Sequence, residues 1–286
     1  MAEGAKDLSG ARGIVTRIGA DLPKRVAAGL VLMALALATT WRGGAVFAIF
    51  WLIAAAAILW EWQSLVGAQG LGPRLATGGL ALLAASFLAL KGSPSGAVLA
   101  ALIGVAACAE LARRSAAIGP LWAGAGVLYA SSVAIAVIAL RQESTLGRSA
   151  IFWLFAVVWG ADIMAYFGGR LIGGPKLWPR VSPGKTWSGF LIGVFCGALL
   201  GTLTAPGVGN IGWVFFLSLA TGAVSQGGDL AESAFKRRWG VKDSSALIPG
   251  HGGVMDRLDG FIAAAAFAAL IAAWRSGSGE LAAGLF

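Results

Sequence analysis

The sequence predicts an all-α fold, a polytopic integral membrane bundle of about nine transmembrane helices with a cytoplasmic N-terminus. Of the 286 residues, 58% are hydrophobic and 12% are charged, whereas soluble domains average about 25% charged residues. The mean hydropathy is +0.80, and long apolar runs recur along the chain. This composition excludes intrinsic disorder. A disulfide-stapled secreted domain is also excluded, because Cys108 and Cys196 each lie inside an apolar run.

Nine apolar runs approach the length of a transmembrane helix, which is about 20 residues and about 17 at the short end. Residues 1–25 precede them and lack the apolar stretch of a signal peptide, so we predict a charged cytoplasmic leader. The expected spans are 26–41, 44–65, 73–90, 95–112, 117–140, 149–168, 187–205, 211–230 and 259–274. They divide the chain into N-terminal helices (26–148), a polar-rich transmembrane region with two cytoplasmic loops (149–274) and a C-terminal tail (275–286).

Basic residues set the predicted orientation, because cytoplasmic loops carry an excess of Lys and Arg. With the N-terminus inside, 17 of the 22 Lys and Arg residues fall on the cytoplasmic side. Membrane topology therefore explains the net charge of +9, and we expect no nucleic-acid partner.

A ladder of glycines marks the seventh span, where Gly189, Gly193, Gly197 and Gly201 repeat every four residues. Small residues at this spacing let another helix approach closely. The ladder favours packing inside the bundle or at a homodimer interface, and the sequence leaves both open.

Three carboxylates are expected to converge between the eighth and ninth spans. Asp229 is predicted to end one helix, and Asp256 and Asp259 to open the next, where their spacing places them on one helix face. Carboxylates that face one point repel each other unless a cation lies between them. Hard oxygen ligands suit Mg²⁺, which prefers one or two carboxylates together with substrate phosphates and water. We therefore predict a metal site at Asp229, Asp256 and Asp259.

The residues between these carboxylates are typical of a site for a phosphorylated ligand. Four cations, one histidine and two glycines stand out: Lys236, Arg237, Lys242, Arg257, His251, Gly252 and Gly253. Cations can hold phosphate oxygens, and glycine turns can aim N–H groups at an anion. Taken singly, these residues also fit positive-inside signals, a structural histidine and a simple turn. Beside several acidic residues at a membrane boundary, they favour a functional site.

A second polar cluster is predicted toward the cytoplasmic end of the sixth span. Asp162 lies inside the span, and Tyr166 and Arg170 follow on the same helix face. An ionisable residue at that depth indicates a functional cavity, with a structural pairing to a neighbouring span as the alternative.

The loop after this span contains Ser182 and the sequence Gly-Lys-Thr at 184–186. We reject a P-loop, because Pro179 stands where its first glycine is required and no strand is expected before it. We predict instead a Ser-Pro turn at Ser182 that presents Lys185 and Thr186 to a phosphate.

The stretch from Ser233 to Asp259, SAFKRRWGVKDSSALIPGHGGVMDRLD, resembles the 27-residue signature of the phosphatidate cytidylyltransferases, also called CDP-diacylglycerol synthases. The resemblance is strong from about residue 150 to 272 and includes two upstream patterns, Asp162-x-x-x-Tyr166-x-x-Gly169-Arg170 and Ser182-Pro183-x-Lys185-Thr186. Gly184 and Ser188 depart from the family, whose members often carry Lys and Glu there. These departures put in doubt an essential role for either position.

The resemblance implies that the protein transfers a cytidylyl group from CTP to phosphatidic acid, giving CDP-diacylglycerol and pyrophosphate. It also implies that the protein works in contact with membrane lipids. It implies Mg²⁺, paired with a second cation such as K⁺. The implied catalytic residues are Asp229, Lys236, Asp256 and Asp259. The implied substrate-binding residues are Asp162, Tyr166, Ser182, Lys185, Arg237, Lys242, His251, Gly252, Gly253 and Arg257. We expect a bacterial inner membrane, with the active site on the cytoplasmic side.

Three other classes fit less well. A transporter or flippase would place polar residues near the midplane of several spans, whereas here they gather at one face. A CDP-alcohol phosphatidyltransferase would carry the pattern Asp-Gly-x-x-Ala-Arg, but the residues after Asp259-Gly260 lack the arginine. A structural scaffold would leave the cluster over 229–259 unexplained.

Overall fold

The computed structural model describes residues 26–115, 119–142, 146–248, 250–277 and 280–286, so the predicted leader and Pro249 lie outside the described residues. Each predicted span is a helix. The first is Val26–Arg42, followed by α2 (Gly44–Val66), α3 (Leu71–Leu90), α4 (Pro94–Ser115), α5 (Pro120–Leu140), α6 (Leu146–Ile172), α7 (Trp187–Thr204), α8 (Ile211–Arg238) and α9 (Met255–Ser276). The predicted C-terminal tail contains a short 3-10 helix, η1 (Leu281–Gly284), which packs against α9.

Seven of these helices, α2 to α7 and α9, are long and apolar enough to cross a membrane. The first helix is shorter, and α8 carries charged residues in its second half. The predicted class, an all-α bundle of an integral membrane protein, is confirmed. The orientation of its N-terminus stays a prediction.

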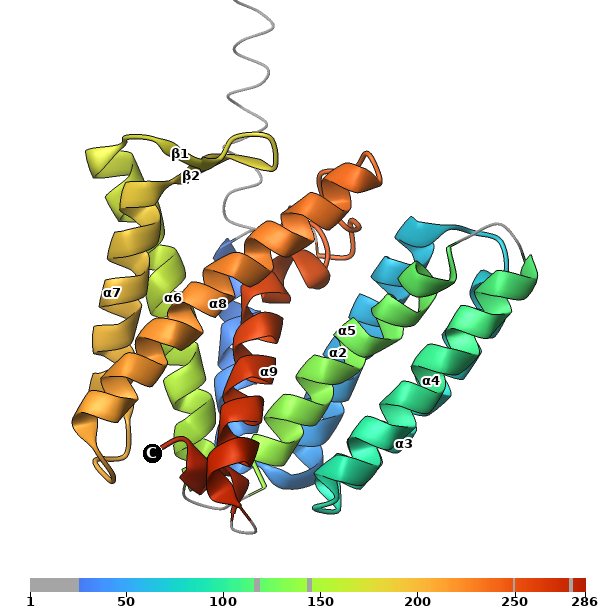
Figure 1. Cartoon of the computed structure of the whole chain (residues 1–286), viewed down its shortest axis with the longest axis horizontal. Helices are drawn as coiled ribbons and strands as arrows, with labels where there is room; N and C mark the ends of the chain where they lie inside the picture. Colours follow the sequence, from blue (N-terminus) through green and yellow to red (C-terminus); the bar gives the residue numbers. More distant parts are fainter. Residues whose placement is uncertain (1–25, 116–118, 143–145, 249, 278–279) are drawn as a thin grey trace, which may run out of the picture.

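The helices form two groups that α9 joins (Figure 1). Helices α2 to α5 pack against one another, and α6 to α8 form the second group. Helix α9 contacts α5 and α2 on one side and α8 and α6 on the other. Every polar segment singled out in the sequence lies at one end of the bundle, where the chain passes from α6 to α7 and from α8 to α9 (Figure 1).

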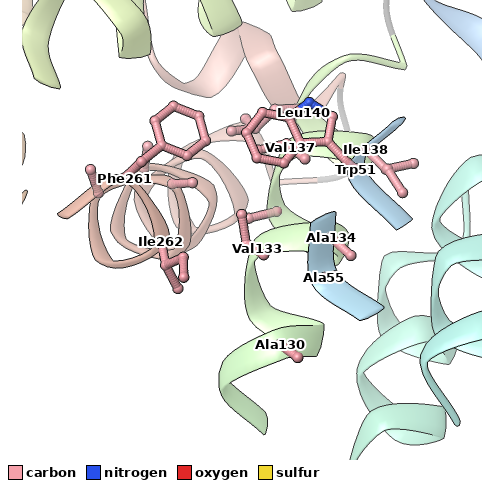
Figure 2. Close-up of a cluster of buried hydrophobic side chains, with 14 of the residues drawn as sticks. Trp51, Ala55, Ala130, Val133, Ala134, Val137, Ile138, Leu140, Phe261 and Ile262 are labelled. Carbon is pink, nitrogen blue, oxygen red and sulfur yellow. The ribbon is translucent and has the colours of Figure 1, made fainter. Parts of the chain in front are cut away.

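The core between the groups is built from α2, α5 and α9 (Figure 2). Trp51 of α2 stacks on Phe261 of α9 with their ring centroids 5.0 Å apart. Val133 and Val137 of α5 are fully buried beside them. Burial of these side chains holds α9 in register with the N-terminal helices, although α2 and α9 are far apart in sequence.

The segment between α6 and α7 is a β-hairpin, which corrects the expected loop. Strand β1 (Lys176–Trp178) pairs antiparallel with β2 (Ser182–Thr186). A strand therefore does precede the Gly-Lys-Thr sequence, contrary to the prediction. The P-loop remains rejected because this sequence lies within β2 and Pro179 replaces the required glycine. Thr186 ends the hairpin and caps α7, its hydroxyl accepting from the Gly189 N–H.

The glycine ladder of α7 faces α6 inside the bundle. A Cβ atom on Gly193 would lie 2.5 Å from the Ala161 carbonyl oxygen, and one on Gly197 would lie 2.7 Å from that of Val157. The two backbones are thus in direct contact, which is the first of the two uses that the sequence left open. The homodimer stays a prediction, and the ladder no longer supports it.

We expect Gly193→Ala to lower the thermal unfolding midpoint of the detergent-purified protein, because the added methyl group overpacks the α6–α7 contact at a cost of about 1–3 kcal/mol. Gly79→Ala on α3 is the matched control, since no atom lies within 4 Å of its added Cβ. Equal midpoints for the two variants would contradict this role for the ladder.

Candidate functional site

A cavity of about 530 Å³ opens between the end of α6, the β-hairpin, the start of α7 and the middle of α8. Its ionisable and hydroxyl lining includes Asp162, Tyr166, Arg170, Lys176, Ser182, Lys185 and Asp229. The structure therefore brings together the second polar cluster, the Ser-Pro turn and one carboxylate of the predicted metal site. Three cations and two carboxylates in one cavity suit a ligand that carries several negative charges.

A chain of polar contacts crosses the cavity from α6 to α8. Gln226 Nε2 donates to Asp162 Oδ1 at 2.7 Å, and Lys185 Nζ donates to Gln226 Oε1 at 3.3 Å. The Lys185 ammonium also lies 2.6 Å from Asp229 Oδ2. The hairpin lysine is therefore the cation between two helix-borne carboxylates.

Glycines bring Asp259 of α9 close to Asp229 of α8. A Cβ atom on Gly228 would lie 3.0 Å from the Asp259 carbonyl oxygen, and one on Gly260 would lie 2.6 Å from Ser225 Oγ. The α8 and α9 backbones therefore touch where each carries its carboxylate. Asp229 and Asp162 are both near enough for their negative charge to act on the Asp259 carboxyl group, so three acidic residues share this region.

Helix α8 continues to Arg238, which corrects the prediction that Asp229 ends it. The sequence predicts a loop for the basic residues after Asp229. In the structure they form two further turns of α8, and the ion pair between Glu232 and Lys236 stabilises these turns. Lys236 Nζ lies 2.8 Å from Glu232 Oε2 and 2.6 Å from Asp256 Oδ1. All three side chains are at most 10% exposed. Lys236 thus joins α8 to the start of α9.

Asp256 organises the loop between α8 and α9. The Ser244 N–H donates to both of its carboxylate oxygens, at 2.8 Å to Oδ2 and 3.1 Å to Oδ1, and the Gly253 N–H donates to Oδ2 at 2.7 Å. The Ser244 hydroxyl also donates to it at 3.0 Å. Hydrogen bonds of this kind orient a carboxylate, whether it acts as a loop anchor or as a metal ligand.

Glu61 of α2 holds the same loop from the other side and was missed in the sequence. Its fully buried carboxylate accepts the N–H groups of Val254 and Met255 at 2.8 and 2.7 Å. It also accepts the Ser245 hydroxyl at 2.7 Å and lies 3.1 Å from the Ser244 hydroxyl, whose single proton it shares with Asp256. Val254, the N-cap of α9, offers no side-chain cap of its own. A carboxylate from another helix therefore satisfies the free N–H groups and the positive end of the α9 dipole.

The two loop glycines face these carboxylates rather than the cavity. Gly252 has a φ of +81°, and a Cβ atom there would lie 2.6 Å from Asp256 Oδ2. A Cβ atom on Gly253 would overlap Ser244 and Glu61. Any side chain at either position would displace a buried carboxylate, so the structure explains these glycines by loop packing.

The remaining predicted residues lie outside the lining of the cavity: Arg237 at the end of α8, Lys242 and His251 in the loop, and Arg257 in the first turn of α9. Arg237 donates to the Val241 carbonyl oxygen at 2.9 Å, and Arg257 donates to that of His251 at 3.0 Å. Lys242 is exposed. The His251 Nδ1 atom is buried without a hydrogen-bond partner among the described residues.

Among the described residues, no three His, Cys, Asp or Glu side chains are gathered closely enough to hold a metal ion by themselves. Asp229 and Asp259 are nevertheless neighbours, and their oxygen chemistry suits Mg²⁺ completed by phosphate oxygens. The predicted ligand set at Asp229, Asp256 and Asp259 stays a prediction.

Glu61 and Gln226 each had a signal in the sequence. Glu61 is an acidic residue within the apolar run of α2, and Gln226 is a polar residue one turn before Asp229. A polar residue inside a span calls for a partner. The identity of that partner needed the structure.

Comparison with known proteins supports one family. Residues 23–274 match the family described as "Cytidylyltransferase family". A protein of Brucella abortus (strain 9-941) named phosphatidate cytidylyltransferase is 42% identical over 259 residues, covering 88% of this chain and 94% of its own length. A protein of the same name from Pseudomonas aeruginosa is 36% identical over 272 residues, covering 90% and 99%. Another from Haemophilus influenzae is 48% identical over 128 residues, covering 42% and 44%.

We expect Glu61→Gln to speed hydrogen exchange at the Val254 and Met255 amides by about tenfold or more, because the new amide group replaces an oxygen that accepts their N–H groups. Gln63→Leu is the matched control. Gln63 is equally buried on α2, but it bonds to Ala123 and Arg74 and not to the loop. Exchange at 254 and 255 that stays unchanged in Glu61→Gln, or rises equally in the control, would contradict this role.

Proposed function

This chain belongs to the cytidylyltransferase family, and we propose that the cavity between α6, the β-hairpin and α8 is its catalytic centre. Its reaction transfers a cytidylyl group from CTP to phosphatidate and yields CDP-diacylglycerol and pyrophosphate, a step of phospholipid biosynthesis. The observation that carries the assignment of the site is the contact of Lys185 with Asp229 inside a cavity that also holds Arg170 and Lys176. CTP and phosphatidate both carry phosphates that these three cations can bind.

The chemistry requires two anions to meet. An oxygen of the phosphatidate phosphate attacks the α-phosphorus of CTP, and the bond from that phosphorus to the bridging oxygen breaks as pyrophosphate leaves. The attacking oxygen is already ionised, so no strong general base is needed. The protein supplies position and charge neutralisation. Lys185, Arg170 and Lys176 are the groups that we assign to the phosphates.

A divalent cation fits the carboxylates at this end of the bundle. Asp229 and Asp259 are neighbours that repel each other, and Lys185 is the cation that the described structure places on Asp229. We propose that they hold Mg²⁺ with Asp256, whose hydrogen bonds orient it, while a second cation such as K⁺ is a further proposal. When bound, the metal would neutralise phosphate charge and assist departure of pyrophosphate.

The cavity lies beside an apolar surface at the end of α6. Tyr166, Leu171 and Ile172 are 60%, 83% and 67% exposed, which suits contact with lipid. We propose that the phosphatidate headgroup enters here from the bilayer while its acyl chains stay among lipids, and that CTP enters from water. The basic residues at this end support a cytoplasmic site in a bacterial inner membrane.

The seventh-span ladder is used between α6 and α7, so a homodimer would need another surface. We keep the homodimer as a proposal and assign it no residues.

We expect Asp259→Asn to lower incorporation of labelled CTP into phosphatidate by about 100-fold or more at a fixed Mg²⁺ concentration. Chelation by EDTA should abolish incorporation by the wild type, and excess Mg²⁺ should partly restore the variant. Glu110→Gln is the matched control, because Glu110 bonds to Arg113 and Arg114 on the surface of α4. An unchanged Mg²⁺ dependence in Asp259→Asn would rule out the proposed ligand.

We expect Lys185→Gln to lower kcat/KM by about 100-fold or more, because one cation leaves the cavity and Asp229 loses its partner. Arg180→Gln, in the turn of the same hairpin but outside the cavity, should stay near wild type. Equal losses in both variants would mean that the hairpin matters for folding alone. Activity close to wild type in Lys185→Gln would remove this lysine from the mechanism.

A further inference from the structure

A second cavity, of about 380 Å³, lies at the end of the bundle opposite the β-hairpin. The junction of the first helix with α2 forms one wall, and the ends of α3 and α5 with the start of α6 form the others. Arg42, Arg141 and Arg148 line it. It shares no residue with the catalytic cavity.

This cavity is positively charged although it lies at the end of the bundle that carries few basic residues. Among the described residues, Lys and Arg are scarce at this end, and only Lys91 and Arg275 accompany the three arginines. None of the described residues that line the cavity is acidic. Three guanidinium groups in one recess concentrate positive charge there, which attracts an anion.

Contacts within the protein hold Arg141 firmly and place Arg148 over an aromatic ring. Buried Arg141 donates to the carbonyl oxygens of Thr40 and Trp41 at 2.8 and 3.4 Å, which ties it to the end of the first helix. The turn at Gly43 leaves room for this guanidinium, because a Cβ atom there would lie 2.6 Å from Arg141 Nη2. Arg148 lies over the indole of Trp41 at 4.6 Å. Arg42 and Arg148 are therefore the groups that could turn toward a ligand.

The surroundings indicate which anion fits. A guanidinium group can donate two parallel hydrogen bonds to two oxygens of one phosphate. Trp41 is 66% exposed at the end of a membrane helix, the level at which tryptophan contacts lipid headgroups. Phe47, Leu90 and Ile138 add apolar walls. The volume suits a headgroup better than a whole lipid, since pockets for small ligands begin at about 300 Å³.

We propose that this cavity binds the phosphate headgroup of an anionic glycerophospholipid in the membrane leaflet opposite the catalytic centre, with Arg42 and Arg148 on the phosphate. The proposal is independent of the assigned reaction, because it uses no residue of the catalytic cavity.

The test measures phosphatidylglycerol retained by the full-length purified protein in native mass spectrometry, over a series of lipid concentrations. We expect the double variant Arg42→Gln/Arg148→Gln to bind about tenfold more weakly than wild type, because charge-assisted bonds to phosphate are lost. Lys91→Gln is the matched control, a cation at the same end but outside the cavity. Lys185→Gln removes a cation from the other cavity and should leave this binding in place.

Four results would overturn the proposal. Equal retention of phosphatidylglycerol by the wild type and the double variant would show that the two arginines do not bind the lipid. Retention of phosphatidylcholine equal to that of phosphatidylglycerol would show that the site does not prefer an anionic lipid. Loss of retention in Lys185→Gln alone would move the lipid to the catalytic cavity. Inorganic phosphate that protects the protein from heating, without retention of phosphatidylglycerol, would make the ligand a free anion. If the double variant unfolds, the single variants give the same comparison, and CTP-dependent activity reports their folding.

Discussion

Carboxylates buried where the bundle meets the membrane edge constrain this structure more than any other group. Glu61, Glu232 and Asp256 are almost excluded from solvent, where an unpartnered carboxylate would be strongly destabilising. One network of hydrogen bonds and ion pairs includes all three carboxylates. The α8–α9 loop gives its N–H groups and hydroxyls to Glu61 and Asp256, and Lys236 lies between Asp256 and Glu232. The shape of the loop follows from the charges that it satisfies.

Close contact of backbones places the other charged groups. Helices α6 and α7 touch along the glycine ladder, and α8 and α9 touch at Gly228 and Gly260. In lipid, where no hydrophobic force draws helices together, small residues allow this approach. Asp162, Asp229 and Asp259 are thus carried on helices whose spacing cannot vary much. A catalytic centre that works by positioning benefits from such rigid support.

The sequence was sufficient for the helices and for part of the cavity, where it predicted Asp162, Tyr166, Ser182, Lys185 and Asp229 but not Lys176 or Gln226. Long apolar runs identify spans because lipid leaves few alternatives. It was insufficient where local signals conflict. The strands of the hairpin are three and five residues long and contain glycine, proline and lysine. They therefore lack the alternation of apolar and polar residues that would predict a strand. The second half of α8 was predicted as a loop because charged residues end the apolar run there. Its Ala, Glu, Lys and Arg residues favour helix, and Lys236 pairs both with Glu232 within α8 and with Asp256 of α9. Glu61 could not be matched to a loop more than 180 residues away.

That separation has a consequence for how the protein is made. Glu61 precedes Ser244 by 183 residues, a delay on the order of ten to forty seconds at typical rates of synthesis. During this interval α2 is in the membrane while the donors for its carboxylate do not yet exist. Glu61 lies in the last turns of α2. Its donors come from the loop before α9, so the network around this carboxylate closes only when the last long helix packs onto one of the first.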